Sequence, residues 1–260
     1  MAADRLTEIP ADVLDLIETQ TGPVLTYETV SGGLNSAVAA RVRTADTTVF
    51  VKGLRSDHRR VWTQQREADI NPSVRHLAPA VLWHAQEAGW DLLGFEDIDG
   101  QHADYTPGSP DLPLVVSAMA RLSSITAPGI VLKSMPDRVK SHSDCPELFA
   151  GTTLLHTDWF PTNVLVTGDR AALVDWAWAS RGAAWIDPAL WAVWLVKSGH
   201  TPEAAEGWAA RVPAWNTAPA CAVTAFAKAT VSVWEEIAEG EREGWVLDIL
   251  RAARSWYDSR

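Results

Sequence analysis

The chain has 260 residues and a hydrophobic content of 47%, enough for one large domain or two lobes around a sizeable core. Its formal net charge of −11 argues against nucleic acid as a partner, because phosphate backbones demand basic patches. The two cysteines, Cys145 and Cys221, are too few for a disulfide framework or a metal cluster. The N-terminal segment MAADRLTEIPADVLD has no apolar signal core, and the apolar run near residues 189–196 is too short to span a bilayer. We therefore expect a cytoplasmic protein without a membrane partner.

The first hundred residues alternate between strand-like and helical patterns. An amphipathic helix comes first and is stopped by Gly22 and Pro23. A second helix is expected to end before Pro72, because proline disfavours helical geometry in the residue that precedes it. The predicted elements are a helix over 11–20, strands over 25–30, 38–42 and 47–54, a helix over 57–71, and strands over 80–86 and 90–93.

A glycine-containing loop between the first two strands is a candidate phosphate flap. The backbone N–H groups of Gly32 and Gly33 can approach β- and γ-phosphates closely, because glycine has no side chain in the way. Ser31 and Ser36 add hydroxyl donors. A simple turn is the alternative interpretation, since Gly-Gly between strands is common in turns.

Lys52 lies inside the apolar run Val49-Phe50-Val51-Lys52. Alternation along a strand places Phe50 and Lys52 on one face and the two valines on the other. After a candidate phosphate loop, such a lysine is typical of a side chain that pairs with α- and β-phosphates. It needs a carboxylate to hold it, and the helix that follows offers Glu67, which we favour, and Asp69. A surface lysine on an amphipathic strand is the alternative.

The rest of the chain is richer in helical patterns. The segment 101–111 reads as a loop, and Asp111 is a candidate cap for the next helix. Residues 126–146 contain three prolines and a glycine, and only short helical pieces are expected there. The predicted elements are a helix over 112–124, a hairpin of strands 164–166 and 171–174, a helix over 188–197 capped by Asp187, a helix starting at Thr201-Pro202, and helices over 219–238 and 241–257.

The hairpin and the loop before it carry the strongest chemical pattern, LLHTDWFPTNVLVTGDRAALVD. Asp158 and Asn163 stand in the loop, and Asp175 follows the second strand. One carboxylate of this kind orients a substrate hydroxyl or takes its proton, while an amide and a second carboxylate bind Mg²⁺ against nucleotide phosphates. The order of residues therefore predicts phosphoryl transfer, with Asp158 as the catalytic group and Asn163 and Asp175 as metal ligands.

This stretch resembles the aminoglycoside phosphotransferases and the wider group of small-molecule kinases with a protein-kinase-like fold. Residues 156–165, HTDWFPTNVL, are similar to the family's H-G-D-x-x-P-x-N-V-L signature, and Val174-Asp175-Trp176 is similar to its (I/V)-D-W motif. Two residues depart from the pattern. Thr157 replaces glycine and narrows the backbone freedom, and Trp159 replaces a leucine-like residue and is expected to reshape the substrate mouth.

The resemblance implies an α+β, bilobal protein-kinase-like fold. An N-terminal antiparallel sheet lobe with a helix would span 1–98 and bind the nucleotide, and a mainly helical C-terminal lobe would span 99–260. The segment FEDIDG is similar to the hinge between lobes, where Glu96 and Ile98 would hold adenine by backbone groups. His156 is a possible base, but the resemblance favours a bracing role, and Asp187 is expected to secure the catalytic region without binding metal.

The predicted function is a small-molecule kinase that uses ATP, with GTP as the alternative, and Mg²⁺. The acceptor is expected to be a hydroxyl of an aminoglycoside or other antibiotic, or of an amino-sugar or amino-alcohol metabolite. A protein kinase is disfavoured, because no arginine precedes Asp158 and neither D-F-G nor A-P-E follows. A catalytically silent nucleotide-binding pseudokinase is disfavoured, because it would lack at least one of four key residues. All four are present: Lys52, Asp158, Asn163 and Asp175. Five acids in the C-terminal part could attract a cationic substrate, although solvated helix faces are the favoured interpretation. They are Glu203, Glu206, Glu235, Glu236 and Glu239.

Overall fold

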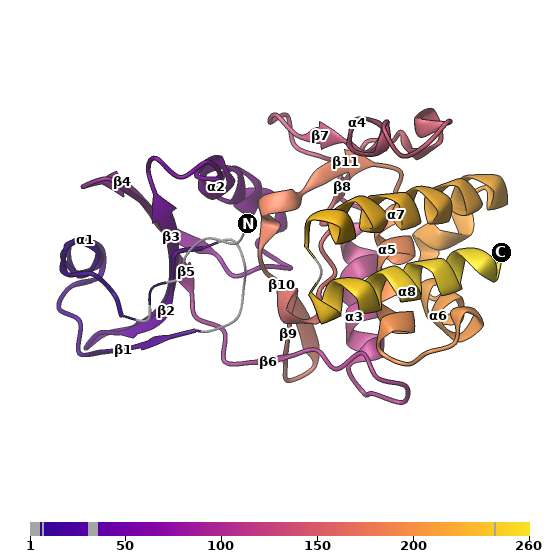
Figure 1. Cartoon of the computed structure of the whole chain (residues 1–260). Helices are drawn as coiled ribbons and strands as arrows, with labels where there is room; N and C mark the ends of the chain where they lie inside the picture. Colours follow the sequence, from indigo (N-terminus) through magenta and orange to yellow (C-terminus); the bar gives the residue numbers. More distant parts are fainter. Residues whose placement is uncertain (1–5, 7, 31–35, 242) are drawn as a thin grey trace. The chain divides into compact units, whose positions relative to one another are not determined.

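A computed structural model describes residues 6, 8–30, 36–241 and 243–260 of the chain. The chain forms two compact units (Figure 1). The N-terminal unit contains residues 1–99 together with the short segment 174–177, and the C-terminal unit contains residues 100–173 and 178–260. The assignment of residues 1–98 to nucleotide binding and of 99–260 to catalysis stays a prediction.

The N-terminal unit is built on a five-stranded antiparallel sheet with the strand order β1-β2-β3-β5-β4. Its predicted strands all form, and β5 runs three residues further than expected, so that it includes Phe95 and Glu96. The elements are α1 (Ala11–Thr21), β1 (Thr26–Thr29), β2 (Val38–Arg43), β3 (Thr48–Arg55), α2 (Trp62–Val74), β4 (Val81–Glu87) and β5 (Trp90–Glu96).

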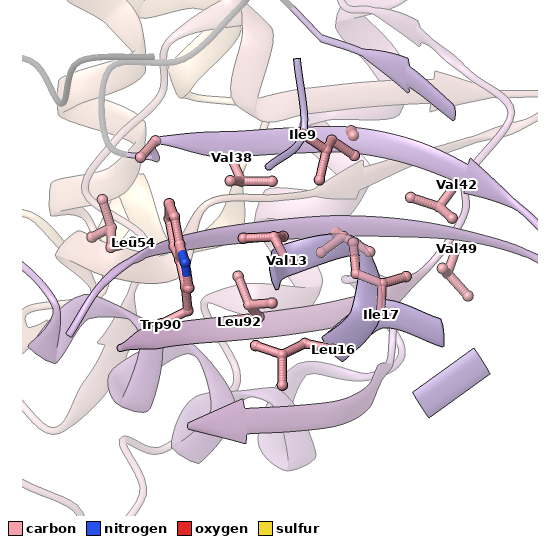
Figure 2. Packing of buried hydrophobic residues seen from close by; sticks show 13 residues of the cluster. Ile9, Val13, Leu16, Ile17, Val38, Val42, Val49, Leu54, Trp90 and Leu92 are labelled. Atoms are coloured by element: carbon pink, nitrogen blue, oxygen red, sulfur yellow. The ribbon is translucent and has the colours of Figure 1, made fainter. Parts of the chain in front are cut away.

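One face of this sheet carries the apolar core of the unit, which Figure 2 shows from close by. Val13 and Ile17 of α1 are fully buried in one cluster with Val49 and Val51 of β3. Burying each such side chain contributes about 1.5–3 kcal/mol to folding. Because side chains alternate along a strand, Lys52 points to the opposite face of the sheet, toward α2.

Helix α2 differs from its predicted extent at both ends. It begins at Trp62 rather than at residue 57, and it runs through Pro72 to Val74, so the prediction that Pro72 ends it was wrong. A proline near the end of a helix removes only one backbone hydrogen bond. Asn71 offsets that loss, because its side chain accepts from the Val81 amide at 2.8 Å and donates to the Pro79 carbonyl at 2.7 Å.

The C-terminal unit combines two small sheets with five longer helices in its described residues. One sheet has the order β10-β9-β6 and contains the predicted hairpin, and the other has the order β7-β11-β8. The elements are β6 (Gln101–His102), α3 (Leu112–Leu122), β7 (Lys133–Ser134), α4 (Met135–Val139), β8 (Thr153–Leu155), β9 (Val164–Thr167), β10 (Arg170–Leu173), β11 (Ser180–Gly182), α5 (Ile186–Lys197), α6 (Pro202–Ala209), α7 (Ala220–Gly240) and α8 (Gly244–Asp258).

The helices of this unit pack on one another, α7 on α8, α8 on α5, and α5 on α6 (Figure 1). Thr201 caps α6 as predicted, because its hydroxyl accepts from the Ala204 amide at 3.2 Å. Asp111 is the N-cap residue of α3, as predicted, but its carboxylate makes no capping bond and accepts instead from the Asp104 amide at 2.8 Å. None of the helices in the described ranges is both long and apolar enough to cross a membrane.

Candidate active site

The first group of candidate residues lies in the N-terminal unit, where Lys52 meets two carboxylates. Its Nζ atom is 2.6 Å from Oε1 of Glu67 in α2 and 3.5 Å from Oδ1 of Asp175. The side chains of Lys52 and Glu67 are 9% and 3% exposed. The alternative carboxylate, Asp69, is exposed and accepts a hydrogen bond from Gln65. The lysine is therefore held by Glu67, as the sequence pattern favoured.

Burial and charge act against each other at this lysine. Burial disfavours the ammonium of Lys52, but attraction by Asp175 and Glu67 outweighs it and raises the pKa of the lysine. Burial, together with the charge of Asp175, raises the pKa of Glu67 to about 7, although Lys52 and the backbone amide of Trp176 act in the opposite direction. One ammonium does not neutralise the two carboxylates, so a proton on the buried Glu67 relieves the excess negative charge.

The raised pKa of Glu67 predicts a pH-dependent loss of stability. Between pH 4.5 and about 7 the folded chain keeps a proton on Glu67 that the unfolded chain has released. This contribution to stability is present below pH 4.5 and is lost as the pH rises through 7. We expect the unfolding free energy of the wild type to fall by up to about 3 kcal/mol over this interval relative to that of Glu67→Gln.

Urea denaturation of the two proteins at several pH values measures this difference. Asp69→Asn, at an exposed position of the same helix, is the matched control. It keeps Glu67 and should therefore lose stability relative to Glu67→Gln as the wild type does. A difference between wild type and Glu67→Gln that stays constant from pH 4.5 to 7.5 would contradict the prediction.

The predicted hinge leaves the end of β5 and is tied to β2. The amide of Glu96 donates to the carbonyl of Ala80 at 2.9 Å. Arg41 donates to a carboxylate oxygen of Asp97 at 2.8 Å and to the carbonyl of Ile98 at 3.2 Å. Within the described part of the chain the amide of Ile98 has no hydrogen-bond acceptor, so it is available to one on a ligand.

Only the end of the predicted phosphate loop can be placed. Residues 31–33 lie outside the described residues. Ser36 is buried, and the amide of the following Ala37 donates to the carbonyl of Gly53 at 2.9 Å. The loop thus returns to the sheet beside the residue that follows Lys52.

The second group of candidate residues lies in the C-terminal unit, in the loop after β8. The amide of Asp158 donates to Nδ1 of His156 at 3.3 Å, and its carbonyl accepts from the side-chain amide of Asn163 at 3.2 Å. His156 is 1% exposed, so its imidazole braces the loop from inside. Since Asn163 uses its nitrogen within the loop, its Oδ1 is the atom that a metal ion would use.

The buried Asp187 holds the same loop through two of its backbone amides. Its Oδ2 accepts from the amide of His156 and its Oδ1 from the amide of Thr157, both at 2.9 Å. Burial raises the pKa of Asp187, while the indole of Trp159 and the two amides partly offset this effect. Asp187 is the second residue of α5, and the prediction that it caps this helix was wrong because both oxygens are used by the loop.

The backbone adopts an uncommon conformation next to Asp158 and at Asp175. Among the described non-glycine residues, positive φ angles occur at Ala88 (50°), Thr157 (66°) and Asp175 (62°). Left-handed geometry is costly for residues with a side chain, most of all for β-branched ones. Such strain concentrates at functional sites, where the surrounding contacts impose it.

Trp159 does not line a substrate mouth, and that expectation was wrong. Its side chain is 1% exposed, and its ring lies 5.7 Å from that of His156, centroid to centroid. A large apolar ring gains more from burial than from exposure at a loop surface.

One contact of the loop was not predicted from the sequence. Arg138 lies in α4, within the proline-containing stretch 126–146, and its guanidinium donates to the hydroxyl of Thr157 at 2.9 Å. No motif marks this arginine, because only tertiary structure brings α4 beside the loop after β8.

Three of the acids proposed to attract a cation have partners within the chain. Oε2 of Glu236 lies 3.2 Å from Nε2 of His142. Glu235 accepts from Arg254 at 2.7 Å. Glu206 accepts from the indole of Trp256 at 2.7 Å and pairs with Arg260. Glu206 and Glu235 therefore support helix packing in the C-terminal unit.

Comparison with known proteins agrees with the pattern of the loop. Residues 132–221 match the model of the phosphotransferase enzyme family (APH). This segment includes the loop after β8 and its hairpin. A comparison with curated protein sequences found no match.

Several solved structures share the fold of the whole chain. Choline kinase LicA from Streptococcus pneumoniae has a TM-score of 0.69 at 15% identity, over 96% of this chain and 98% of its own. A thermostable mutant of aminoglycoside phosphotransferase APH(4)-Ia has a TM-score of 0.64 at 15% identity, over 94% and 99%. A putative fructosamine-3-kinase from Haemophilus somnus 129PT has a TM-score of 0.64 at 14% identity, over 94% and 96%.

These similarities confirm the predicted α+β, protein-kinase-like fold and the resemblance to the aminoglycoside phosphotransferase family. Structures of the APH(4)-Ia mutants contain AMP-PNP or ADP together with hygromycin B. A LicA structure contains AMP.

Proposed function

We propose that this chain, which matches the phosphotransferase enzyme family over residues 132–221, is a kinase that transfers the γ-phosphoryl group of ATP to a hydroxyl of a small molecule. The observation that carries the proposal is the loop after β8, in which His156 and Asn163 bond the backbone of Asp158 from two sides. GTP is the alternative donor.

Asp158 orients the acceptor hydroxyl and takes its proton. The hydroxyl oxygen then bonds to the γ-phosphorus, and the bond from that phosphorus to the bridging oxygen breaks. The bridging oxygen keeps the electron pair, and ADP leaves. Chemistry of this kind depends mainly on positioning and on neutralising charge, which explains why the loop is braced so closely.

Lys52 supplies positive charge for the α- and β-phosphates. Its ion pair with Glu67 keeps the ammonium in one position, and its raised pKa keeps it charged at neutral pH. In this proposal Ser31, Gly32, Gly33 and Ser36 bind the phosphates. The adenine edge bonds to the carbonyl of Glu96 and the amide of Ile98.

In this proposal Asn163 and Asp175 are the protein ligands of a magnesium ion. They offer one amide and one carboxylate oxygen, the hard ligands that Mg²⁺ prefers in small number beside phosphates and water. The described ranges contain no cluster of three or more His, Cys, Asp or Glu side chains that could hold a metal alone. Such a cluster is not needed where phosphates complete the coordination. When bound, Mg²⁺ neutralises phosphate charge during transfer.

The acceptor proposed is an alcohol that also carries a positively charged nitrogen, either an antibiotic such as an aminoglycoside or an amino-alcohol or amino-sugar metabolite. Two observations support this class. The similar structures are named as kinases of choline, aminoglycosides and fructosamine, which are all hydroxylated amines. The net charge of −11 favours the approach of a cation.

A phosphate-transfer assay against a mixed panel tests the proposal. The panel contains aminoglycosides, nucleoside and peptide antibiotics, amino sugars and choline-like alcohols, each with ATP or GTP and Mg²⁺. We expect turnover on a hydroxylated amine that is lost in Asp158→Ala. Tight Mg²⁺-dependent ATP binding without transfer to any member would favour a silent nucleotide-binding protein instead.

A further inference from the structure

The residue before Asp158 is held in an unfavourable backbone conformation. Thr157 has a φ angle of 66°, in the left-handed region. A β-branched residue avoids this region, because its Cβ substituents clash with the neighbouring backbone. The surrounding contacts must therefore hold Thr157 in place.

The side chain and amide of Thr157 are both engaged. Its hydroxyl donates to the carbonyl of Trp178 at 2.7 Å and accepts from Nη1 of Arg138 at 2.9 Å. Its amide donates to Asp187. Glycine at this position could also make the backbone hydrogen bond to Asp187. The two hydrogen bonds of the hydroxyl are what the threonine adds.

Three acceptors share the two N–H bonds of Nη1 of Arg138. Besides the Thr157 hydroxyl, its Nη1 donates to the carbonyl of Trp178 at 2.6 Å and to Oγ of Ser180 at 2.9 Å. The guanidinium carbon also lies 5.9 Å from the centroid of the Trp178 ring. Ser180 is fully buried and itself donates to the same carbonyl at 3.1 Å. We call these four residues the Arg138 clamp.

The sheet β7-β11-β8 brings the members of the clamp together. Thr157 follows β8, and Arg138 follows β7 in α4. Ser180 is the first residue of β11, and Trp178 lies two residues before it. Strand β11 pairs with both neighbours, with Ser180 opposite Leu155 and opposite Lys133. The pairing of these strands therefore fixes where Arg138 contacts the loop, at Thr157, two residues beyond the end of β8.

We propose that Arg138 is a positioning residue for phosphoryl transfer. Its guanidinium, through the Thr157 hydroxyl and the Trp178 carbonyl, keeps the backbone before Asp158 left-handed and so sets the direction of the Asp158 carboxylate. The catalytic part of this inference rests on the proposed function. The same guanidinium joins the segment before Asp158 to the segment that follows Asp175 in the chain.

A cycle of substitutions separates this role from simple packing. Glycine adopts positive φ without strain, so Thr157→Gly removes the need for the clamp. We expect Arg138→Met to lower kcat by about tenfold or more, with KM for ATP changed by less than about twofold. In the Thr157→Gly background, the same arginine change should cost less than about threefold.

Two more threonine variants and one arginine variant complete the design. Thr157→Ser keeps the hydroxyl and should remain dependent on Arg138, whereas Thr157→Val keeps the shape, loses the hydroxyl and should behave like Arg138→Met. Arg211→Met is the matched control, because Arg211 stacks on Trp208 at 3.8 Å in the same unit and is exposed. We expect kcat of this control to equal that of the wild type.

Hydrogen exchange gives a second measurement that needs no acceptor. In Arg138→Met the amides of residues 156–160 should exchange about tenfold faster than in the wild type, and the increase should shrink in the Thr157→Gly background. Equal effects of Arg138→Met in both backgrounds, on kcat and on exchange, would overturn the proposal. If the wild type transfers no phosphate, the catalytic role of Arg138 is excluded. The structural role of the clamp then stands only if the exchange effect of Arg138→Met is smaller in the Thr157→Gly background. An equal exchange effect in both backgrounds would exclude the structural role as well.

Discussion

Replacing Asp158 with alanine is expected to lower kcat for phosphate transfer by about 10³-fold while leaving Mg²⁺-dependent ATP binding within about twofold of the wild type. In our proposal the carboxylate faces the acceptor, whereas Lys52 is assigned to the nucleotide. Its backbone groups, which bond to His156 and Asn163, are kept in the variant. The loss should therefore appear in the chemical step and not in the binding of ATP.

Steady-state kinetics on the acceptor found by the panel, together with calorimetric ATP binding, measures both quantities. Asp169→Asn is the matched control, because Asp169 is exposed in the turn between β9 and β10 of the same hairpin. Unchanged turnover in Asp158→Ala would exclude Asp158 as the group that takes the proton. A loss of ATP affinity equal to the loss of kcat would mean that this residue acts on the nucleotide.

Replacing Asp187 with asparagine is expected to lower the unfolding free energy by about 3 kcal/mol. The carboxylate is 2% exposed and accepts from two backbone amides, those of His156 and Thr157. Asparagine can accept from one of them, but its NH₂ group would face the other, leaving a buried donor without a partner. Hydrogen bonds to a charged acceptor are also stronger than those to a neutral one.

Urea denaturation monitored by tryptophan fluorescence measures this loss. Asp258→Asn, at the exposed end of α8, makes the same chemical change without a buried partner and should alter stability by less than about 0.5 kcal/mol. We also expect Asp187→Asn to lower kcat, because the loop that carries Asp158 is no longer held at two points. A variant as stable as the wild type would show that the two amides find other acceptors.

The local patterns of the sequence predicted most strands and helices of both units. Alternation over residues 47–54 indicated β3 and placed Lys52 opposite the two core valines, which agrees with the buried cluster. Such predictions succeed because side-chain direction along a strand or helix follows from backbone geometry alone. The end of α2 was missed, because a tertiary contact of Asn71 outweighs the local effect of Pro72.

The residues of the candidate site were not all equally easy to predict from the sequence. The spacing of Asp158, Asn163 and Asp175 could be recognised because all three lie in one short segment of the chain, residues 158–175. Glu67 was already favoured over Asp69 as the partner of Lys52, and the structure agrees, because Glu67 is buried against Lys52 whereas Asp69 is exposed.

By itself, the sequence determined the chemistry that this protein can offer: a carboxylate, an amide and a second carboxylate in kinase order, and a lysine in a strand. Only the tertiary structure decided which residues hold that chemistry in place. Asp187 and Arg138 reach the loop from α5 and α4, 30 and 19 positions away from Thr157 in the chain. Contacts over such separations depend on how strands pair and helices pack, and no periodicity in one sequence encodes them.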